Sequence, residues 1–156
     1  MTKSSLKKTA FGTAVFFVFI QFFQPARNES GQVLDTDISK TVTLSEGVRA
    51  ILARSCYDCH SNSTHYPWYT YVQPGGWFMA YHVRNGKEKL NFSEFGALSK
   101  RRQESKIESI GKQIEAEAMP LLSYLLLHRN AVLSPSEKAL LVKWVSDSKD
   151  SLAVNH

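Results

Sequence analysis

The hydrophobic positions of this chain recur mostly at the spacing of α-helices. The clearest early case is a predicted helix over residues 44–55, where Thr43 and Glu46 fit a capping box at the start. In such a box Thr43 caps the first turn and Glu46 reaches back to it. The apolar positions on one face of this helix are Val48, Ile51 and Leu52.

Two longer amphipathic segments follow in the second half of the chain. Residues 99–118 are good helix formers, and their apolar stripe consists of Ile107, Ile110 and Ile114. The last helix has a strong start signal, with Ser134 as the cap, Pro135 at the first position and Glu137 at the third. Its apolar face is formed by Leu140, Leu141, Trp144 and Val145.

Residues 61–96, between the first predicted helix and the helix over residues 99–118, are rich in aromatic residues, proline and glycine. Within this segment a short helix is predicted from Trp77 to Arg84, ending at Asn85-Gly86. Nowhere does the sequence show a convincing alternation of apolar and polar residues that would indicate a strand. The pattern therefore predicts an all-α domain.

The N-terminal 25 residues have the pattern of a membrane or export segment. Lys3, Lys7 and Lys8 precede an apolar run from Ala10 to Phe23. No small residues that would form a cleavage site follow, so we predict an uncleaved inner-membrane anchor, with a cleaved periplasmic signal as the alternative. The lysines would stay in the cytoplasm and the remainder would be exported. Residues 1–25 are thus the anchor or signal, 26–43 a polar linker, and 44–150 the domain.

The composition is that of a globular protein, with 43% hydrophobic and 21% charged residues. The formal charge is +5, but three of the 19 basic residues lie in the N-terminal segment. No basic block with interleaved aromatic residues indicates nucleic-acid binding. The charge therefore does not identify a partner.

The two cysteines form the motif Cys56-Tyr57-Asp58-Cys59-His60. Two thiols at this spacing can each add to one vinyl group of a haem, and the following histidine is then placed as an axial ligand of the iron. The motif predicts one covalently attached haem c per chain, with His60 bound to the iron.

Three other interpretations of the cysteine pair are weaker. A thioredoxin-like redox pair would need a βαβ setting, which the sequence lacks. A zinc site would need four ligands, and only two cysteines and scattered histidines are present. A disulfide between residues three positions apart would close almost no chain, so it would stabilise the fold little.

The ligand on the opposite face of the haem is predicted to be Met119, with His82 as the main alternative. Met119 precedes Pro120 between two predicted helices, and a thioether there would complete a His/Met site. Weaker candidates are Met79, His65 and His128. Candidates for the wall around the haem are Trp68, Tyr71, Trp77 and Tyr81, and Arg84 is a candidate partner for a propionate.

A longer run of motifs resembles the bacterial haem-binding domain family. The run comprises Ser55 to Asn62, Pro67-Trp68-Tyr69, His82-Val83, Leu90-Asn91-Phe92-Ser93, Met119-Pro120 and Leu127-His128. The resemblance implies a small cytochrome c-like helical domain with Cys56, Cys59 and His60 as its haem residues, and Met119 and His82 both fall in its motifs. This chain has Leu121 where a second proline is usual, and Asn85-Gly86-Lys87 where Gly-Arg is usual.

These observations favour a monohaem c-type cytochrome domain that transfers electrons at the periplasmic face of the membrane to a redox partner protein. If both axial positions are filled, substrate cannot reach the iron, which argues against an enzyme. The competing function is a haem-based sensor or a peroxidase-like enzyme with an open sixth position. A third is a haem module that only assembles with a partner.

Overall fold

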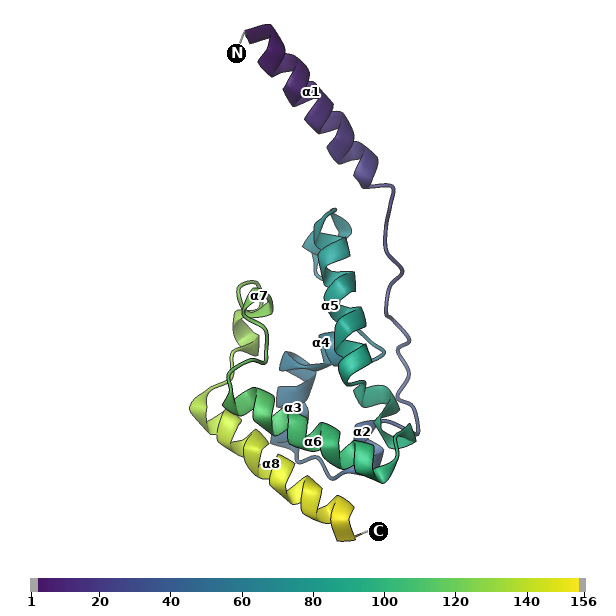
Figure 1. The fold of residues 1–156 in the computed structure, drawn as a ribbon, viewed down its shortest axis with the longest axis vertical. Helices are drawn as coiled ribbons and strands as arrows, with labels where there is room; N and C mark the ends of the chain where they lie inside the picture. Colours follow the sequence, from purple (N-terminus) through teal and green to yellow (C-terminus); the bar gives the residue numbers. More distant parts are fainter. Residues whose placement is uncertain (1–2, 155–156) are drawn as a thin grey trace.

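The computed structural model describes residues 3–154 and is built from helices (Figure 1). Within that range the structure contains no strand, and its β-type pairing is limited to one isolated bridge between Glu29 and Ser63. The all-α prediction is therefore confirmed. The α-helices are α1 (Lys3–Ile20), α2 (Ile38–Thr41), α3 (Glu46–Ser55), α4 (Tyr57–His60), α5 (Gly75–Lys89), α6 (Lys100–Glu115), α7 (Leu122–Leu125) and α8 (Pro135–Val154). Short 3₁₀ helices cover η1 (Trp68–Tyr71), η2 (Phe92–Ala97) and η3 (Arg129–Ala131).

The core lies where α3 and η2 pack against the pair formed by α6 and α8, which run side by side (Figure 1). The sequence predicts the α6 stripe correctly, since Ile107 and Ile114 are buried and Ile110 packs against the core. On α8, Leu141, Trp144 and Val145 are buried, whereas Leu140 lies at the edge. Burial of such side chains stabilises the fold by roughly 1.5–3 kcal/mol each.

Local hydrogen bonds fix where the helices begin. At the start of α8 the backbone N–H of Ser134 donates to Glu137 Oε2 at 2.8 Å, and the N–H of Glu137 donates to Ser134 Oγ at 3.3 Å. This is the predicted capping box. At α3 the prediction is wrong by two residues: the cap is Ser45, whose hydroxyl accepts from the N–H of Val48, and not Thr43.

Part of the predicted linker 26–43 packs into the domain. Ile38 of α2 and Val42 are buried in the core, and Asp37 caps α2 by accepting from the N–H of Ser39. Earlier in the segment, Asn28 Nδ2 donates to the carbonyl of Ser61 at 2.7 Å. These residues therefore run along the domain rather than away from it.

The predicted helix at Trp77–Arg84 is longer in the structure and continues as α5 to Lys89. Asn85-Gly86 does not end it, although glycine usually favours a helix end. Gly86 instead lies at the point where α5 packs on the carbonyl of Cys59. Gly86 is therefore present because α5 packs closely at this position, and not because the helix ends there.

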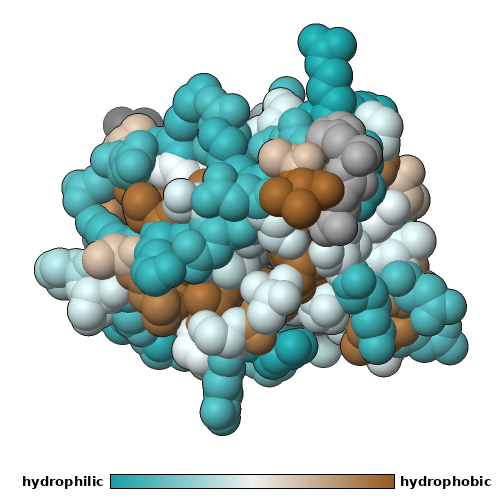
Figure 2. All heavy atoms as spheres, turned by 90° about the horizontal axis from the view of Figure 1, so that it is seen from below, coloured by the Kyte–Doolittle hydropathy of each residue, from teal (hydrophilic) through white to brown (hydrophobic). Residues whose placement is uncertain are grey.

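The N-terminal helix α1 extends away from the rest of the chain (Figure 1). Its apolar side chains are exposed, including Phe11 and Phe16. Across residues 3–154 no helix is both long and apolar enough to cross a membrane, so the predicted spanning anchor is not supported. Residues 1–2 of the predicted N-terminal segment lie outside the described residues. Seen from below, the opposite end of the molecule is mainly hydrophilic with separate apolar patches (Figure 2).

Candidate haem site

The cysteine–histidine motif forms a single helical turn directly after α3. The N–H of Cys56 donates to the carbonyl of Leu52 at 2.9 Å, which closes α3, and the chain then begins α4. The N–H groups of Cys59 and His60 both donate to the carbonyl of Cys56, at 3.2 and 3.0 Å. Because all three side chains come from this one turn, their relative positions are fixed by local backbone hydrogen bonds.

The imidazole of His60 is oriented as a metal ligand would be. Its Nδ1 lies 3.0 Å from the carbonyl oxygen of Leu90, and only a protonated Nδ1 can donate to that oxygen. The other ring nitrogen, Nε2, then has a free lone pair. Burial lowers the pKa of His60, which favours the neutral form that binds metals. The carbonyl of Leu90, at the end of α5, therefore selects the tautomer.

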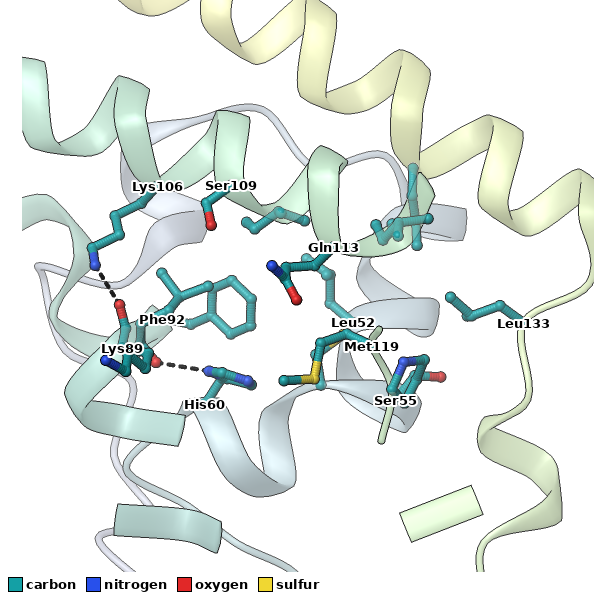
Figure 3. A pocket seen from close by; sticks show the side chains of 16 residues that line it. Leu52, Ser55, His60, Lys89, Phe92, Lys106, Ser109, Gln113, Met119 and Leu133 are labelled. Carbon is teal, nitrogen blue, oxygen red and sulfur yellow. Dashed lines mark hydrogen bonds between the residues drawn. The ribbon is translucent and has the colours of Figure 1, made fainter. Parts of the chain in front are cut away.

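His60 and Met119 line the same apolar cavity, whose volume is about 350 Å³. In Figure 3 the sulfur end of the Met119 side chain is directed toward the ring of His60. Apolar residues from α3, α6 and α8 form the walls, among them Leu52, Ile110, Ile114 and Leu141. The backbone of Met119 is attached to α6, because its N–H donates to the carbonyl of Gln113. The fold thus brings together two residues 59 positions apart, His60 at the end of α4 and Met119 after α6.

Two further spaces adjoin this cavity around the motif. One of about 160 Å³ is lined by Cys56, Cys59, His60, Met119 and His82. The next, of about 380 Å³, is lined by Cys59 and His82 together with residues of α7. The three neighbouring spaces share lining residues, and together they are called the groove. Both candidate sixth ligands lie along it, with His82 further toward α7.

Both cysteines are free thiols. Burial, and to a smaller extent the neighbouring thiol of Cys59, raises the pKa of Cys56 to about 12. Burial, and to a smaller extent the charge of Asp58, raises the pKa of Cys59 to about 11. The two sulfurs are therefore neutral at ordinary pH and open onto the shared groove. Neutral imidazole, paired thiols and a thioether around an apolar groove are a donor set that fits a haem with covalent attachment.

The close contact between α5 and α4 depends on Gly86. A Cβ at this position would lie 2.4 Å from the carbonyl oxygen of Cys59 and 3.1 Å from its Cβ. Only a residue without a side chain allows α5 to lie this close to the motif. The contact holds the carbonyl of Leu90 where His60 Nδ1 meets it, since Leu90 follows α5 directly.

Replacing Gly86 by alanine is therefore expected to destabilise the haem-loaded protein by roughly 1–3 kcal/mol. Helix propensity alone would predict the opposite sign, because alanine is favoured over glycine by about 1 kcal/mol inside a helix. Urea unfolding followed by haem absorbance measures the change. Gly47→Ala in α3 is the matched control, since its Cβ would meet only the tip of Leu140, at 3.2 Å. Equal stability of the Gly86 and Gly47 variants would contradict the packing role.

Several residues proposed from the sequence lie away from this groove. Trp68, Tyr71, Trp77 and Tyr81 are exposed and do not line its three spaces. Phe78, Phe92, Tyr69 and Tyr124 line it instead. Arg84 lines a separate pocket together with Arg27 and Lys87. Met79 and His128 line the end near α7, and His65 is exposed.

Two lysines at the groove were not expected from any sequence pattern. Lys89 and Lys106 both line the cavity that holds His60 and Met119, and the Lys106 ammonium donates to the carbonyl of Lys89 (Figure 3). They come from α5 and α6, so no local pattern connects them. Nor did the sequence reveal the bond from Tyr124 to Asp58 inside the motif. Both features depend on how distant helices meet.

The all-α fold and this donor set define a helical haem-binding domain. The sequence profile of the family described as Haem-binding domain matches residues 15–147, so the chain belongs to that family. The profile covers the cysteine–histidine motif, His82 and Met119. Searches of curated proteins and of solved structures each found no match for this chain.

Proposed function

We propose that the domain holds one haem c through thioethers from Cys56 and Cys59, with His60 and Met119 as axial ligands, and that it transfers electrons. The single observation that carries this proposal is the convergence of the motif turn and Met119 on one apolar groove. A haem bound there supplies a one-electron iron couple.

The protein groups divide into anchors, ligands and surroundings. Leu90 fixes the His60 tautomer, so the basic Nε2 faces the groove. Lys89 and Lys106 bring two positive charges to the same cavity, which suits the carboxylates of a haem. The apolar walls keep water away, and a dry, low-dielectric surrounding raises the reduction potential by disfavouring the more highly charged oxidised state.

Electron transfer is favoured over catalysis because the groove offers side chains that can fill the sixth position. Met119 lies in the same space as His60, and His82 lines the adjoining one. An iron with two protein ligands has no position for substrate. The absorption spectrum of the reduced protein, with and without carbon monoxide, tests this function. Rapid binding of carbon monoxide to the reduced wild-type protein would favour the sensor or peroxidase-like alternative.

We also propose that the domain works at the periplasmic face of the inner membrane, held there by its N-terminal segment. This proposal is supported by hydrogen bonds that join the end of the N-terminal segment, residues 21–24, to Gln73 and Trp77 of the domain. Gln21 Oε1 accepts from the N–H of Gln73 at 2.7 Å, and Gln24 Oε1 accepts from Gln73 Nε2 at 2.8 Å. Trp77 Nε1 donates to the carbonyl of Phe23 at 2.7 Å. Gln73 is fully buried by these contacts.

The surface beside this junction has the composition of a membrane interface. Exposed aromatic side chains gather there, and the Arg27 guanidinium lies 3.8 Å from the ring centroid of Tyr71. Tryptophan, tyrosine and arginine are enriched where proteins meet lipid headgroups. The exposed aromatic residues are Trp68, Tyr71, Trp77, Phe78 and Tyr81.

We expect the mature chain to keep its N-terminus and to fractionate with inner membranes. The reason is the exposed apolar surface of α1, which would favour lipid over water. Cell fractionation with N-terminal sequencing measures both. When a separate signal exports the chain so that haem can attach, replacing Phe11, Phe16 and Phe19 by serine should release the haem-loaded chain, whereas the matched control Thr13→Ser should not. A soluble periplasmic product that begins after Pro25 would show that the segment is a cleaved signal.

A further inference from the structure

A hydrogen bond connects the middle of the haem motif to the segment that carries Met119. Tyr124 Oη donates to Asp58 Oδ2 at 2.7 Å. Asp58 lies between the two cysteines, and Tyr124 lies five residues after Met119, in α7. A bond from a hydroxyl to a carboxylate is charge-assisted, and such bonds are about twice as strong as neutral ones.

Both partners of this bond are held in place by further contacts. The other carboxylate oxygen of Asp58 accepts from the N–H of His65 at 3.0 Å, and the carbonyl of Asp58 accepts from the hydroxyl of Thr64 at 2.6 Å. The ring of Tyr124 stacks on His128 with centroids 3.9 Å apart and planes at 12°. His128 in turn lies within hydrogen-bond distance of the Tyr69 hydroxyl, at 3.3 Å. The bond is therefore pre-organised from both sides.

The rest of α7 contributes little to holding this segment closed. None of the residues of α7 is buried, and Leu122, Leu126 and Leu127 are each more than half exposed. Segments with few buried apolar contacts open at low free-energy cost. On the other side of Met119, the N–H groups of Ala118 and Met119 both donate to Gln113 of α6. Met119 thus lies between a backbone attachment to α6 and the side-chain bond to Asp58.

We propose that Tyr124 is a positioning residue that keeps Met119 at the iron by bonding the Met119 segment to Asp58. This inference rests on the proposed function, in which Met119 is the sixth ligand. When the bond is intact, the segment is attached to the same turn that carries His60, so ligand and iron move together. When it is absent, the segment opens more often, and Met119 leaves the sixth position for part of the time.

Tyr124→Phe removes only the hydroxyl and keeps the ring that stacks on His128. In the full, haem-loaded chain we expect carbon monoxide to bind the reduced variant about tenfold or more faster than the wild type, from the strength of such a bond. The oxidised variant should lose the Met-type near-red band at a lower pH than the wild type. Stopped-flow mixing and a spectral pH titration measure these two changes.

Tyr81→Phe is the matched control, because it removes a hydroxyl from an exposed tyrosine of α5 that belongs neither to the Tyr124–Asp58 bond nor to the contacts that support it. It should leave both readings at wild-type values. Asp58→Ala tests the bond from its other side, and in the double variant with Tyr124→Phe the two effects should not add. If Tyr124→Phe fails to load haem, Asp58→Ala alone still tests whether the bond keeps Met119 at the iron.

The outcomes separate this inference from the ligand assignment beneath it. If Met119→Leu opens the iron while Tyr124→Phe and Asp58→Ala both match the wild type, the positioning role is wrong and Met119 remains the ligand. If Met119→Leu leaves the near-red band and the carbon monoxide rate unchanged, the ligand assignment itself fails, and the positioning role fails with it.

Discussion

Replacing Cys56 and Cys59 together by alanine is expected to abolish the haem that stays with the chain through denaturing electrophoresis. Two thioethers are the only bonds in the proposed site that survive unfolding, because axial ligands dissociate when the fold is lost. The wild-type chain, made with c-type maturation machinery, should therefore stain for haem peroxidase activity and the double variant should not. The effect is a complete loss rather than a graded one.

The two single variants provide the matched controls. Cys56→Ala and Cys59→Ala each keep one thiol in the groove, so each should retain some covalent haem through the other thioether. Extraction with acid–acetone separates attached from dissociable haem. Haem that washes out of the wild type would show that this chain binds haem without attaching it. Family membership would stand in that case, since it does not depend on the thioethers.

What could be predicted from the sequence is what short stretches of chain determine. The capping box at Ser134 and Glu137 lies within four residues, and the structure contains it. The turn that brings Cys56, Cys59 and His60 together is equally local. At the start of α3 the sequence pattern predicted Thr43 as the cap, whereas the structure has Ser45 there.

The features that the sequence could not reveal arise where distant segments meet. Gly86 resembles a helix end until the carbonyl of Cys59 is known to lie against it. Ile38 lies in a polar stretch, and only the packing of α2 on η2 shows that it is core. Tyr124 and Asp58 are 66 positions apart, and neither carries a local pattern that predicts a bond. Non-local contacts of this kind decide which aromatic residues surround the groove.

The oxidised wild-type protein is expected to show the weak near-red absorption band of a His/Met haem, and Met119→Leu is expected to remove it. Leucine keeps the apolar volume of the side chain but has no sulfur to bind iron. Met119 is the favoured candidate, because it lines the same cavity as His60 and its sulfur is directed toward the imidazole (Figure 3). Loss of the thioether should also lower the reduction potential, since a thioether favours ferrous iron.

His82→Ala and Met79→Leu test the other candidates. The ring of His82 contacts Phe78 and Tyr81, with centroids 4.3 and 5.5 Å apart, and faces the part of the groove near α7. Met79 is buried and lines that same part, so its replacement by leucine checks for a methionine ligand without creating a cavity. Neither variant should change the near-red band.

Carbon monoxide then distinguishes the functions. Reduced wild type should bind it poorly and Met119→Leu readily, because only the variant has an open sixth position. If His82→Ala alone opens the iron, the ligands are two histidines, and electron transfer remains the function with a lower potential. If the wild type binds carbon monoxide rapidly, and neither replacement changes that rate, no side chain holds the sixth position firmly. The groove would then serve a ligand from solution, and a sensor or a peroxidase-like enzyme would replace the electron carrier as the proposed function.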